Sequence, residues 1–156
     1  MTISKNKVAI LLGSKSDEPG MSGCCEYLSR FGIPYDLKIS SAHRQPDETA
    51  EFVKAAEKNG YAVIIAAAGM AAHLPGVCAS HTTLPVIGVP LEGSALNGVD
   101  ALYSIVQMPP GVPVATVAIG SAGAKNAAVL AAEILALNDA SVKQKLIEFK
   151  KNGARF

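Results

Sequence analysis

The sequence predicts an α/β protein in which helices cover both faces of a five-stranded parallel sheet, giving three αβα layers. Short aliphatic runs alternate with stretches of helical spacing along the 156 residues. Most of these runs are apolar throughout, which is typical of parallel strands buried on both faces. No linker, repeat or low-complexity tract interrupts the alternation. We therefore expect one domain over residues 1–156, with an α/β core at about 7–138 and a C-terminal helix at 141–153.

The first strand is expected at residues 8–12, where the sequence reads VAILL. A helix over residues 18–31 follows, with Ser16 or Asp17 as its N-cap and Gly32 at its end. The sequence YDLKI at residues 35–39 predicts a second strand, and its alternating character favours an edge or near-edge position.

The middle of the chain repeats the strand–helix unit. Helices are expected at residues 46–59 and 71–80, the first opened by a proline. Strands are expected at 62–67 and 85–89.

The last third of the chain predicts a helix at residues 99–108, a strand at 114–119 and an Ala-rich helix at 125–137. Ser141 is the expected cap of the charged C-terminal helix. The strand order 2-1-3-4-5 is favoured, because a first strand that ends in a polar glycine loop usually lies at the switch point where ligands bind.

The charge pattern points to self-association and away from nucleic acid or membrane surfaces. The net charge is only +1, so no general attraction to polyanions is expected. Between residues 60 and 124, only Glu92 and Asp100 are charged. One explanation is that small residues such as Ala, Gly and Ser make an acceptable solvent-exposed surface. However, every helix of a small domain must expose one face, and the helices in this stretch have almost no charges to place there. We therefore favour a large apolar subunit interface.

The cysteines predict reduced thiols in a cytoplasm. Cys24 and Cys25 are adjacent and Cys78 stands apart, so they form neither a disulfide framework nor a metal-ligand spacing. We expect no metal and no organic cofactor. The chain starts without a secretory pattern, and His, Thr and Pro interrupt the long uncharged run at 60–91, so no membrane span is expected.

The sequence GSKSD at residues 13–17 joins the first strand to the first helix. Backbone N–H groups at a helix start, together with Ser14 and Ser16, suit a phosphate, although simple helix capping explains the same residues. Asp17 would repel a phosphate, so it fits better as an acceptor for sugar hydroxyls beside it. A ribonucleotide satisfies both groups.

The sequence SAHRQP at residues 41–46 follows the second strand, at the same edge of the sheet. Arg44 carries a fork suited to phosphate or carboxylate, and His43 can take and give a proton at neutral pH. A single loop histidine is often solvated or structural. The convergence of Ser, Asp, His and Arg on one crevice favours a catalytic role for His43.

The sequence AGMAAHLPG at residues 68–76 follows the third strand. Its small residues let the backbone approach a ligand closely, and a helix start near Ala71 would add N–H donors. His73 fits a packing role as well as a catalytic one. His81 has no comparable setting and is interpreted as structural or solvent-facing.

These segments, in this order, resemble the PurE-type family of 5-(carboxyamino)imidazole ribonucleotide mutases. The resemblance extends over nearly the whole chain, because PVIGVP at 85–90, the segment 98–120 and NAAVLAAEIL at 126–135 also match. It implies a flavodoxin-like domain, a homo-octamer in which the C-terminal helix packs on a neighbouring subunit, and functional coupling to the ATP-dependent synthetase that makes the carbamate.

The resemblance also implies the reaction, in which a carbamate on the exocyclic nitrogen becomes a carboxylate on ring carbon 4, with carbon dioxide released transiently in a closed site. The implied catalytic residue is His43. The implied substrate contacts are Gly13, Ser14, Ser16, Asp17, Ser41, Ala42, Arg44, Gly69, Met70, Ala72, His73 and Leu74.

Two positions depart from the family pattern: Glu18 replaces a common tryptophan, and Gln45 replaces a common threonine. Both bear on affinity more than on the reaction. A carboxylase branch, which uses free carbon dioxide, tends to have Lys-Gly at positions 44 and 45, so Arg44 favours the mutase branch. A non-catalytic nucleotide-binding module of flavodoxin-like fold is the remaining alternative.

Overall fold

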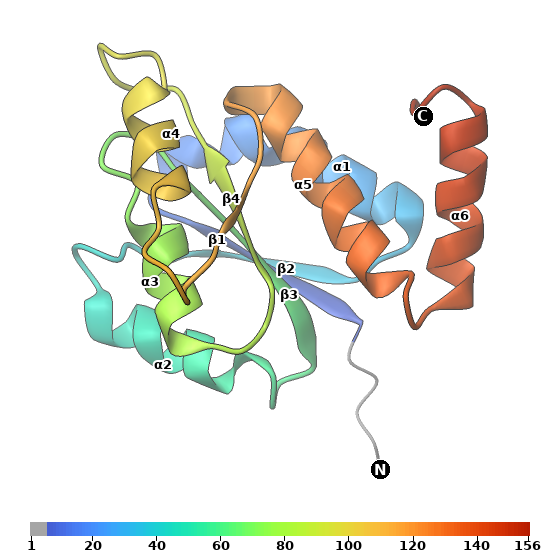
Figure 1. Cartoon of the computed structure of the whole chain (residues 1–156), viewed down its shortest axis with the longest axis horizontal. Helices are drawn as coiled ribbons and strands as arrows, with labels where there is room; N and C mark the ends of the chain where they lie inside the picture. The colour runs from blue at the N-terminus through green and yellow to red at the C-terminus, as the bar shows by residue number, and fades with distance from the viewer. Residues whose placement is uncertain (1–5) are drawn as a thin grey trace.

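Five parallel strands form one sheet in the order β2-β1-β3-β4-β5, in a computed structural model that describes residues 6–156 (Figure 1). The predicted fold class and strand order are confirmed. The strands are β1 (Lys7–Leu12), β2 (Tyr35–Ile39), β3 (Tyr61–Ala68), β4 (Val86–Pro90) and β5 (Ala115–Thr116). The helices are α1 (Glu18–Phe31), α2 (Pro46–Ala56), α3 (Leu74–His81), α4 (Val99–Val106), α5 (Gly120–Leu135) and α6 (Ala140–Lys151).

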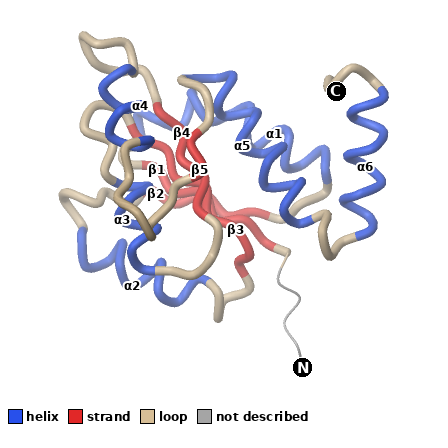
Figure 2. The backbone as a smooth tube through the Cα atoms, viewed as in Figure 1, coloured by secondary structure: helices blue, strands red, loops and turns tan. Residues whose placement is uncertain are grey.

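Helices lie on both faces of the sheet (Figure 2). The alternation of side chains along the strands creates two cores, one on each face. In β1, Val8, Ile10 and Leu12 face the core shared with α1, α5 and α6. Ala9 and Leu11 face the core shared with α2, α3 and α4. All five are fully buried, which explains why this strand is apolar without interruption.

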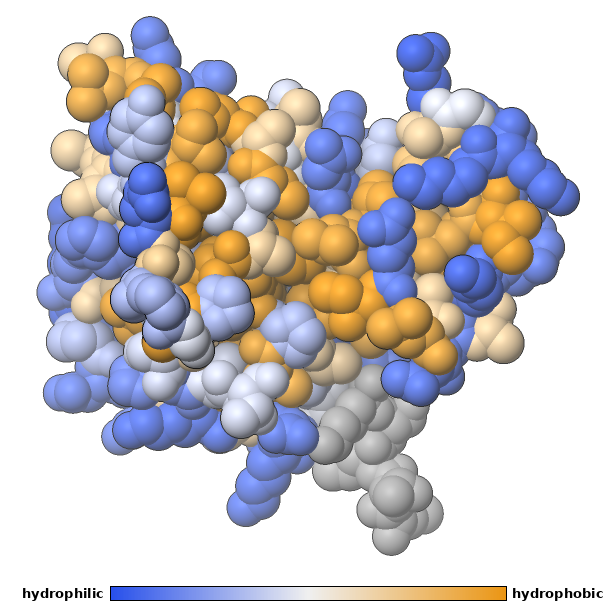
Figure 3. Space-filling model, in the orientation of Figure 1, coloured by the Kyte–Doolittle hydropathy of each residue, from blue (hydrophilic) through white to orange (hydrophobic). Residues whose placement is uncertain are grey.

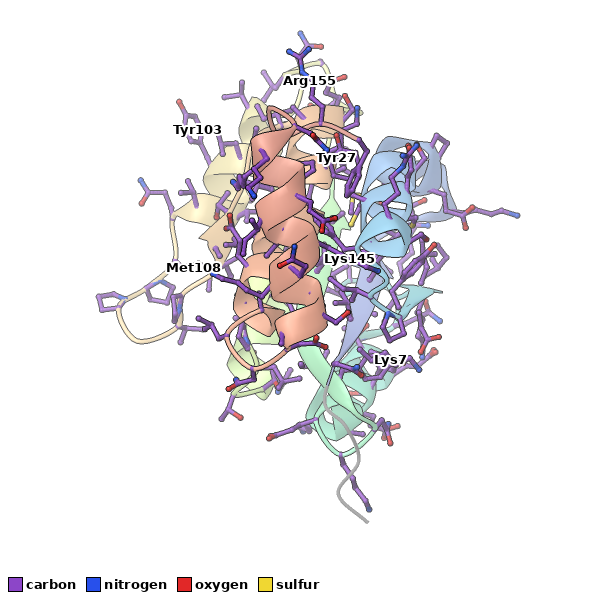
Figure 4. The ribbon with its side chains drawn as sticks, turned by 90° about the vertical axis from the view of Figure 1, so that its right-hand side faces the viewer. Lys7, Tyr27, Tyr103, Met108, Lys145 and Arg155 are labelled. Carbon is purple, nitrogen blue, oxygen red and sulfur yellow. The ribbon has the colours of Figure 1, made fainter. Side chains whose placement is uncertain are left out.

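Helix α6 packs against its own chain. Phe149 is buried and makes edge-to-face contacts with Tyr27 and Phe31 of α1. Lys145 of α6 lies on the side facing α1 (Figure 4). The cap of α6 is Asp139, whose carboxylate accepts the N–H groups of Ser141 and Val142. The prediction of Ser141 as the cap was therefore wrong, and the helix at 140–151 is shifted from the predicted 141–153. Whether α6 also contacts a neighbouring subunit stays a prediction.

Helix α3 begins three residues later than the predicted start at residue 71, because the preceding backbone is not helical. Met70 has a positive φ of 56°, and Pro75 occupies the first turn, where its missing N–H is harmless. His73 is consequently the N-cap of α3 and does not lie within the helix.

The prediction for the last strand and the helix after it was also wrong. Strand β5 has two residues in place of the predicted six at 114–119, and α5 begins at Gly120, not at residue 125. The first turn of α5 lies on the backbone that precedes it: a Cβ at Gly123 would overlap the carbonyl oxygen of Ala118. The chain therefore leaves the sheet early. Helices α2 and α4 end at 56 and 106, two to three residues before their predicted ends.

No helix among residues 6–156 is both long and apolar enough to cross a membrane. The N-terminal segment, for which no secretory signal is predicted, includes residues 1–5, which lie outside the described part of the chain.

A buried chain of hydroxyl groups holds the start of α2 against the sheet. The Thr49 hydroxyl donates its hydrogen to the carbonyl of Gln45 over 2.9 Å. Because that hydrogen is used, Thr49 Oγ1 accepts from the Ser40 hydroxyl over 2.7 Å. Ser40 and Thr49 are both fully buried. The loop 41–45 between them is thereby fixed at both ends.

We expect Thr49→Val to lower the free energy of unfolding by about 1–3 kcal/mol, because it leaves the buried Ser40 hydroxyl without a partner. Urea unfolding measures the change. The double variant Ser40→Ala/Thr49→Val should lose less than the two single variants together, since neither hydroxyl then remains. The exposed Thr83→Val is the matched control. Unchanged stability in Thr49→Val would contradict this role of the pair.

Candidate active site

A cavity of about 600 Å³ opens at the carboxyl end of the sheet, where the loops after β1, β2, β3 and β4 meet. Strand order reverses between β1 and β3, so α1 and α3 leave toward opposite faces and a crevice remains between them. Its lining comprises Gly13, Ser14, Ser16, Asp17, Ser41, Ala42, His43, Arg44, Ala68, Gly69, Met70, Ala71, His73, Leu74, Glu92 and Gly93.

The loop after β1 forms a tight, internally bonded turn at Lys15–Asp17. Ser14 caps this turn, whereas the N-cap of α1 is Asp17, one of the two predicted residues, although the Asp17 side chain makes no capping hydrogen bond to α1. Ser14 Oγ accepts from the N–H of Ser16 at 3.4 Å and from its hydroxyl at 3.0 Å, while Asp17 Oδ2 accepts the N–H of Ser14 at 2.9 Å. The hydrogen of the Ser14 hydroxyl is therefore left to donate toward a ligand.

Asp17 is half-buried at the inner end of this turn. Burial raises the pKa of its carboxyl group above the usual range, and the hydrogen bond from the Ser14 N–H partly opposes the rise. Its Oδ1 makes no hydrogen bond within the described chain, which leaves one acceptor for a ligand hydroxyl.

The loop after β2 presents His43 and Arg44 to the cavity. Ser41 organises it, since its hydroxyl oxygen accepts the N–H of Arg44 at 3.2 Å and its carbonyl accepts the N–H of Gln45 at 2.8 Å. The Arg44 guanidinium makes no ion pair among residues 6–156, so it is available for an anion.

The loop after β3 encloses the opposite side of the cavity. Gly69 lies so close to the neighbouring strand end that an added Cβ would be 3.2 Å from the carbonyl oxygen of Leu91. Met70 adopts the left-handed conformation and exposes 63% of its surface. Strained non-glycine backbone of this kind gathers at binding sites. Ala72, by contrast, is buried beneath the loop and is absent from the cavity lining.

Two histidines separated by 30 residues meet in the cavity. His43 Nε2 lies 2.6 Å from His73 Nδ1, and the rings stand at 88° with their centroids 4.8 Å apart. One of these nitrogens must donate the hydrogen between them. The loops after β2 and β3 are therefore in direct contact through two side chains that can each carry a proton.

Comparison with known proteins identifies the family. The model of the AIR carboxylase family matches residues 7–155, almost the full length of the chain. The chain belongs to this family. It is 54% identical over 145 residues to N5-carboxyaminoimidazole ribonucleotide mutase of Escherichia coli (strain K12), covering 93% of this chain and 86% of that protein. The mutase of Bacillus subtilis (strain 168) is also 54% identical, over 93% of this chain and 90% of its own.

Solved structures agree with this assignment. A crystal structure of Treponema denticola PurE superimposes with a TM-score of 0.83 at 30% sequence identity, over 95% of this chain and 91% of that one. The resemblance that the sequence motifs indicated is therefore confirmed for the family and for the fold.

The cavity contains most of the residues that the sequence motifs predicted to contact a substrate. Every predicted contact except Ala72 lines it. Ala68, Ala71, Glu92 and Gly93 line it as well and were not among the predicted contacts. Glu92 could have been identified from the sequence. It follows β4 by two residues and is one of two charges between residues 60 and 124.

The remaining reactive groups lie outside this chemistry. Burial raises the pKa of the Cys24 thiol strongly and that of Cys78 to about 12, so neither is a thiolate at neutral pH. Within residues 6–156, no three His, Cys, Asp or Glu side chains are grouped to hold a metal ion.

The raised pKa of Asp17 has a consequence for stability. A carboxyl group whose pKa is higher in the folded than in the unfolded chain stabilises the fold in acid, and this contribution is lost as the pH rises through the folded-state pKa. We expect Asp17→Asn to be at least as stable as wild type at neutral pH, because the amide is uncharged and its oxygen still accepts the Ser14 N–H.

Below the usual aspartate range the two proteins should become equally stable, since Asp17 is then protonated in both states. Urea unfolding at the two pH values measures the difference. A variant that is clearly less stable at neutral pH would show that the charge of Asp17 supports the fold.

Proposed function

We propose that the chain converts N5-carboxyaminoimidazole ribonucleotide into 4-carboxy-5-aminoimidazole ribonucleotide, a step of purine biosynthesis. Relatives named as this mutase match over nine-tenths of the chain at more than half identity. The observation that carries the proposal is the convergence of the serine turn, Arg44 and His43 on one cavity. This set provides an anion site and a proton carrier within reach of a single ligand.

The phosphate and ribose are assigned to the loops after β1 and β2. Ser14 and Ser16 offer hydroxyl groups at the start of α1, where backbone N–H groups and the positive end of the helix dipole favour a phosphate. Arg44 supplies the fixed cation, assisted by Ser41. Asp17 keeps Oδ1 for the ribose hydroxyls. Ala42 and the backbone of Gly13 form the wall of the cavity between these loops.

The imidazole base and the migrating carboxylate are assigned to the loop after β3. Its backbone from Gly69 to Leu74 forms this side of the cavity, with Met70 in the lining and His73 beside His43. Carbon dioxide held between these small side chains and the ligand is recaptured where it is released, which replaces a bimolecular encounter by a local one.

His43 is the proposed proton carrier for both half-reactions. It delivers a proton to the exocyclic nitrogen as the nitrogen–carbon bond of the carbamate breaks, which releases carbon dioxide. Ring carbon 4 then bonds to carbon dioxide, and His43 removes the hydrogen that this carbon still carries. No net proton exchanges with water. General acid–base help of this type is worth roughly 10²- to 10⁴-fold.

Two alternatives use the same cavity. A carboxylase would take free carbon dioxide with aminoimidazole ribonucleotide, and the family description names this activity. Arg44 and the name of the 54% identical relatives favour the mutase. A non-catalytic module would bind the ribonucleotide without needing His43.

An ultraviolet assay with two substrates tests the proposal. Wild type should convert the carbamate, and aminoimidazole ribonucleotide with bicarbonate should react far more slowly. His43→Asn should lose about 10²- to 10⁴-fold in kcat, because the amide cannot carry the proton. Binding of the product ribonucleotide, measured by calorimetry, should be nearly unchanged.

Each rival predicts a different result. Faster turnover of aminoimidazole ribonucleotide with bicarbonate than of the carbamate would establish the carboxylase. Tight ribonucleotide binding by a wild type that turns over neither substrate would establish the non-catalytic module.

We also propose that the chain assembles into a homo-octamer. The outer face of α4 carries Val99, Tyr103 and Val106 at helical spacing, and Leu96 precedes it; these four side chains are 41–63% exposed. Tyr103 projects away from the body of the protein (Figure 4), and apolar side chains spread over α4 and α5 on the face seen in Figure 3. An apolar surface of this kind favours a subunit interface.

Light scattering tests the assembly. Wild type should have eight times the chain mass of 16.1 kDa. Tyr103→Glu should shift the mass to smaller species, because a charge on this face must lose its hydration when the interface forms. Glu51→Gln, on the exposed side of α2, is the control and should keep the wild-type mass. A monomeric wild type would overturn the proposal.

The proposal extends to the domain boundaries, the packing of α6 and the cellular setting of the protein. We infer that residues 1–156 act as one mutase domain, and that α6, whose Ile147 remains exposed, packs on a neighbouring subunit. A cytoplasmic location and functional coupling to the carbamate-forming synthetase complete the proposal. The three free cysteines are consistent with a reducing compartment.

A further inference from the structure

The contact between His43 and His73 couples the hydrogen positions of the two rings. A neutral imidazole carries one N–H and one bare nitrogen, so the 2.6 Å approach of His43 Nε2 to His73 Nδ1 requires a donor on one side and an acceptor on the other. Whichever ring donates, the tautomer of one fixes the tautomer of its partner.

Both rings are attached to backbone that is anchored independently of the contact. The N–H of His73 donates to the carbonyl of Ala71 at 2.8 Å, and its carbonyl accepts from Val77 at 2.9 Å in the first turn of α3. The loop that carries His43 is held by the Ser41 bonds described above. The contact therefore joins two fixed segments, and its geometry orients the ring of His43.

The group that orients His43 is an imidazole and not a carboxylate. Among residues 6–156, no carboxylate lies within ion-pair distance of either imidazole, although Glu92 lines the same cavity. A carboxylate would hold the ring equally well, but it would repel a substrate that carries a carboxylate and a phosphate. An imidazole acceptor orients the ring without this cost.

Only one direction of the hydrogen bond survives proton transfer. If His73 donated to Nε2 of His43, the bond would be lost whenever His43 became an imidazolium, because a doubly protonated ring has no acceptor. If His73 accepts, the bond persists in both protonation states of His43. A proton carrier must pass through both states.

We infer that His73 is a positioning residue that accepts the Nε2–H of His43, which leaves Nδ1 of His43 to carry the proton. This inference rests on the proposed mutase reaction. The Nδ1–H goes to the exocyclic nitrogen as the carbamate breaks, and Nδ1 later takes the hydrogen from ring carbon 4. The Nε2–H stays on His43 and keeps its hydrogen bond to Nδ1 of His73 throughout, so the protons balance without a further acid or base.

Nitrogen NMR of the ligand-free protein tests the pairing directly. The chain has three histidines, so single variants assign every imidazole signal. At a pH where the rings are neutral, His43 should be the Nε2–H tautomer. His73→Leu, which removes the acceptor, should make the His43 signals those of a ring that exchanges between tautomers. His81→Leu, at the far end of α3, is the matched control and should leave them unchanged.

Kinetics test the consequence for catalysis. His73→Leu should lower kcat by about 10- to 100-fold, by analogy with the loss seen when the partner that orients a metal-ligating histidine is removed, with KM changed by less than about threefold. His73→Asn should recover most of this loss, because its side-chain oxygen lies near the former Nδ1 and accepts a hydrogen bond.

Other results overturn the inference. An Nδ1–H tautomer of His43 in wild type, or no effect of His73→Leu on the His43 signals, would exclude the proposed bond. A normal kcat in His73→Leu, a change confined to KM, or an Asn variant as impaired as the Leu variant would exclude the positioning role. If wild type fails to turn over the carbamate, the proposed function fails, and the NMR result alone then decides whether the pair exists.

Discussion

The hydrogen-bond ladders on the two sides of β1 determine where the chemistry occurs. Leu12, the last residue of β1, pairs with Ile39 of β2 and with Ala67 of β3, so three strands end at the same level of the sheet. The loops that follow consequently start side by side. Because side chains alternate along a strand, a shift of one residue in either ladder would expose one core and displace the loops together. The buried apolar pattern of β1 prevents such a shift.

Few charged side chains line this cavity. Arg44 is the one arginine of the lining, and the acidic groups are Asp17 and Glu92. The histidine pair contributes orientation without charge in its neutral form. The cavity therefore offers one arginine and two serine hydroxyls to an anion, while no carboxylate among residues 6–156 lies within ion-pair distance of either ring.

The strand order and the three polar loops were predictable because each depends on local signals: apolar runs, helix-starting prolines and the residues that follow strands. The helix at 18–31 and the strand at 35–39 were predicted to the residue. The late start of α3 was not predictable in this way, since it depends on the left-handed backbone of Met70. The short β5 goes with the close approach of Gly123 to Ala118, a contact between residues five apart that neither apolar patterning nor helix propensity indicates. The contact between His43 and His73 likewise requires the fold, because 30 residues separate them.

The approach of Gly123 to the Ala118 carbonyl also limits how this protein can be engineered. Replacing a helical glycine with alanine usually stabilises a protein by restricting the unfolded chain. In α5 that strategy fails at position 123, because even one methyl group would push the helix off the strand end and disturb its packing on α1. A thermostabilised version of this protein must therefore keep this glycine and seek its gains elsewhere.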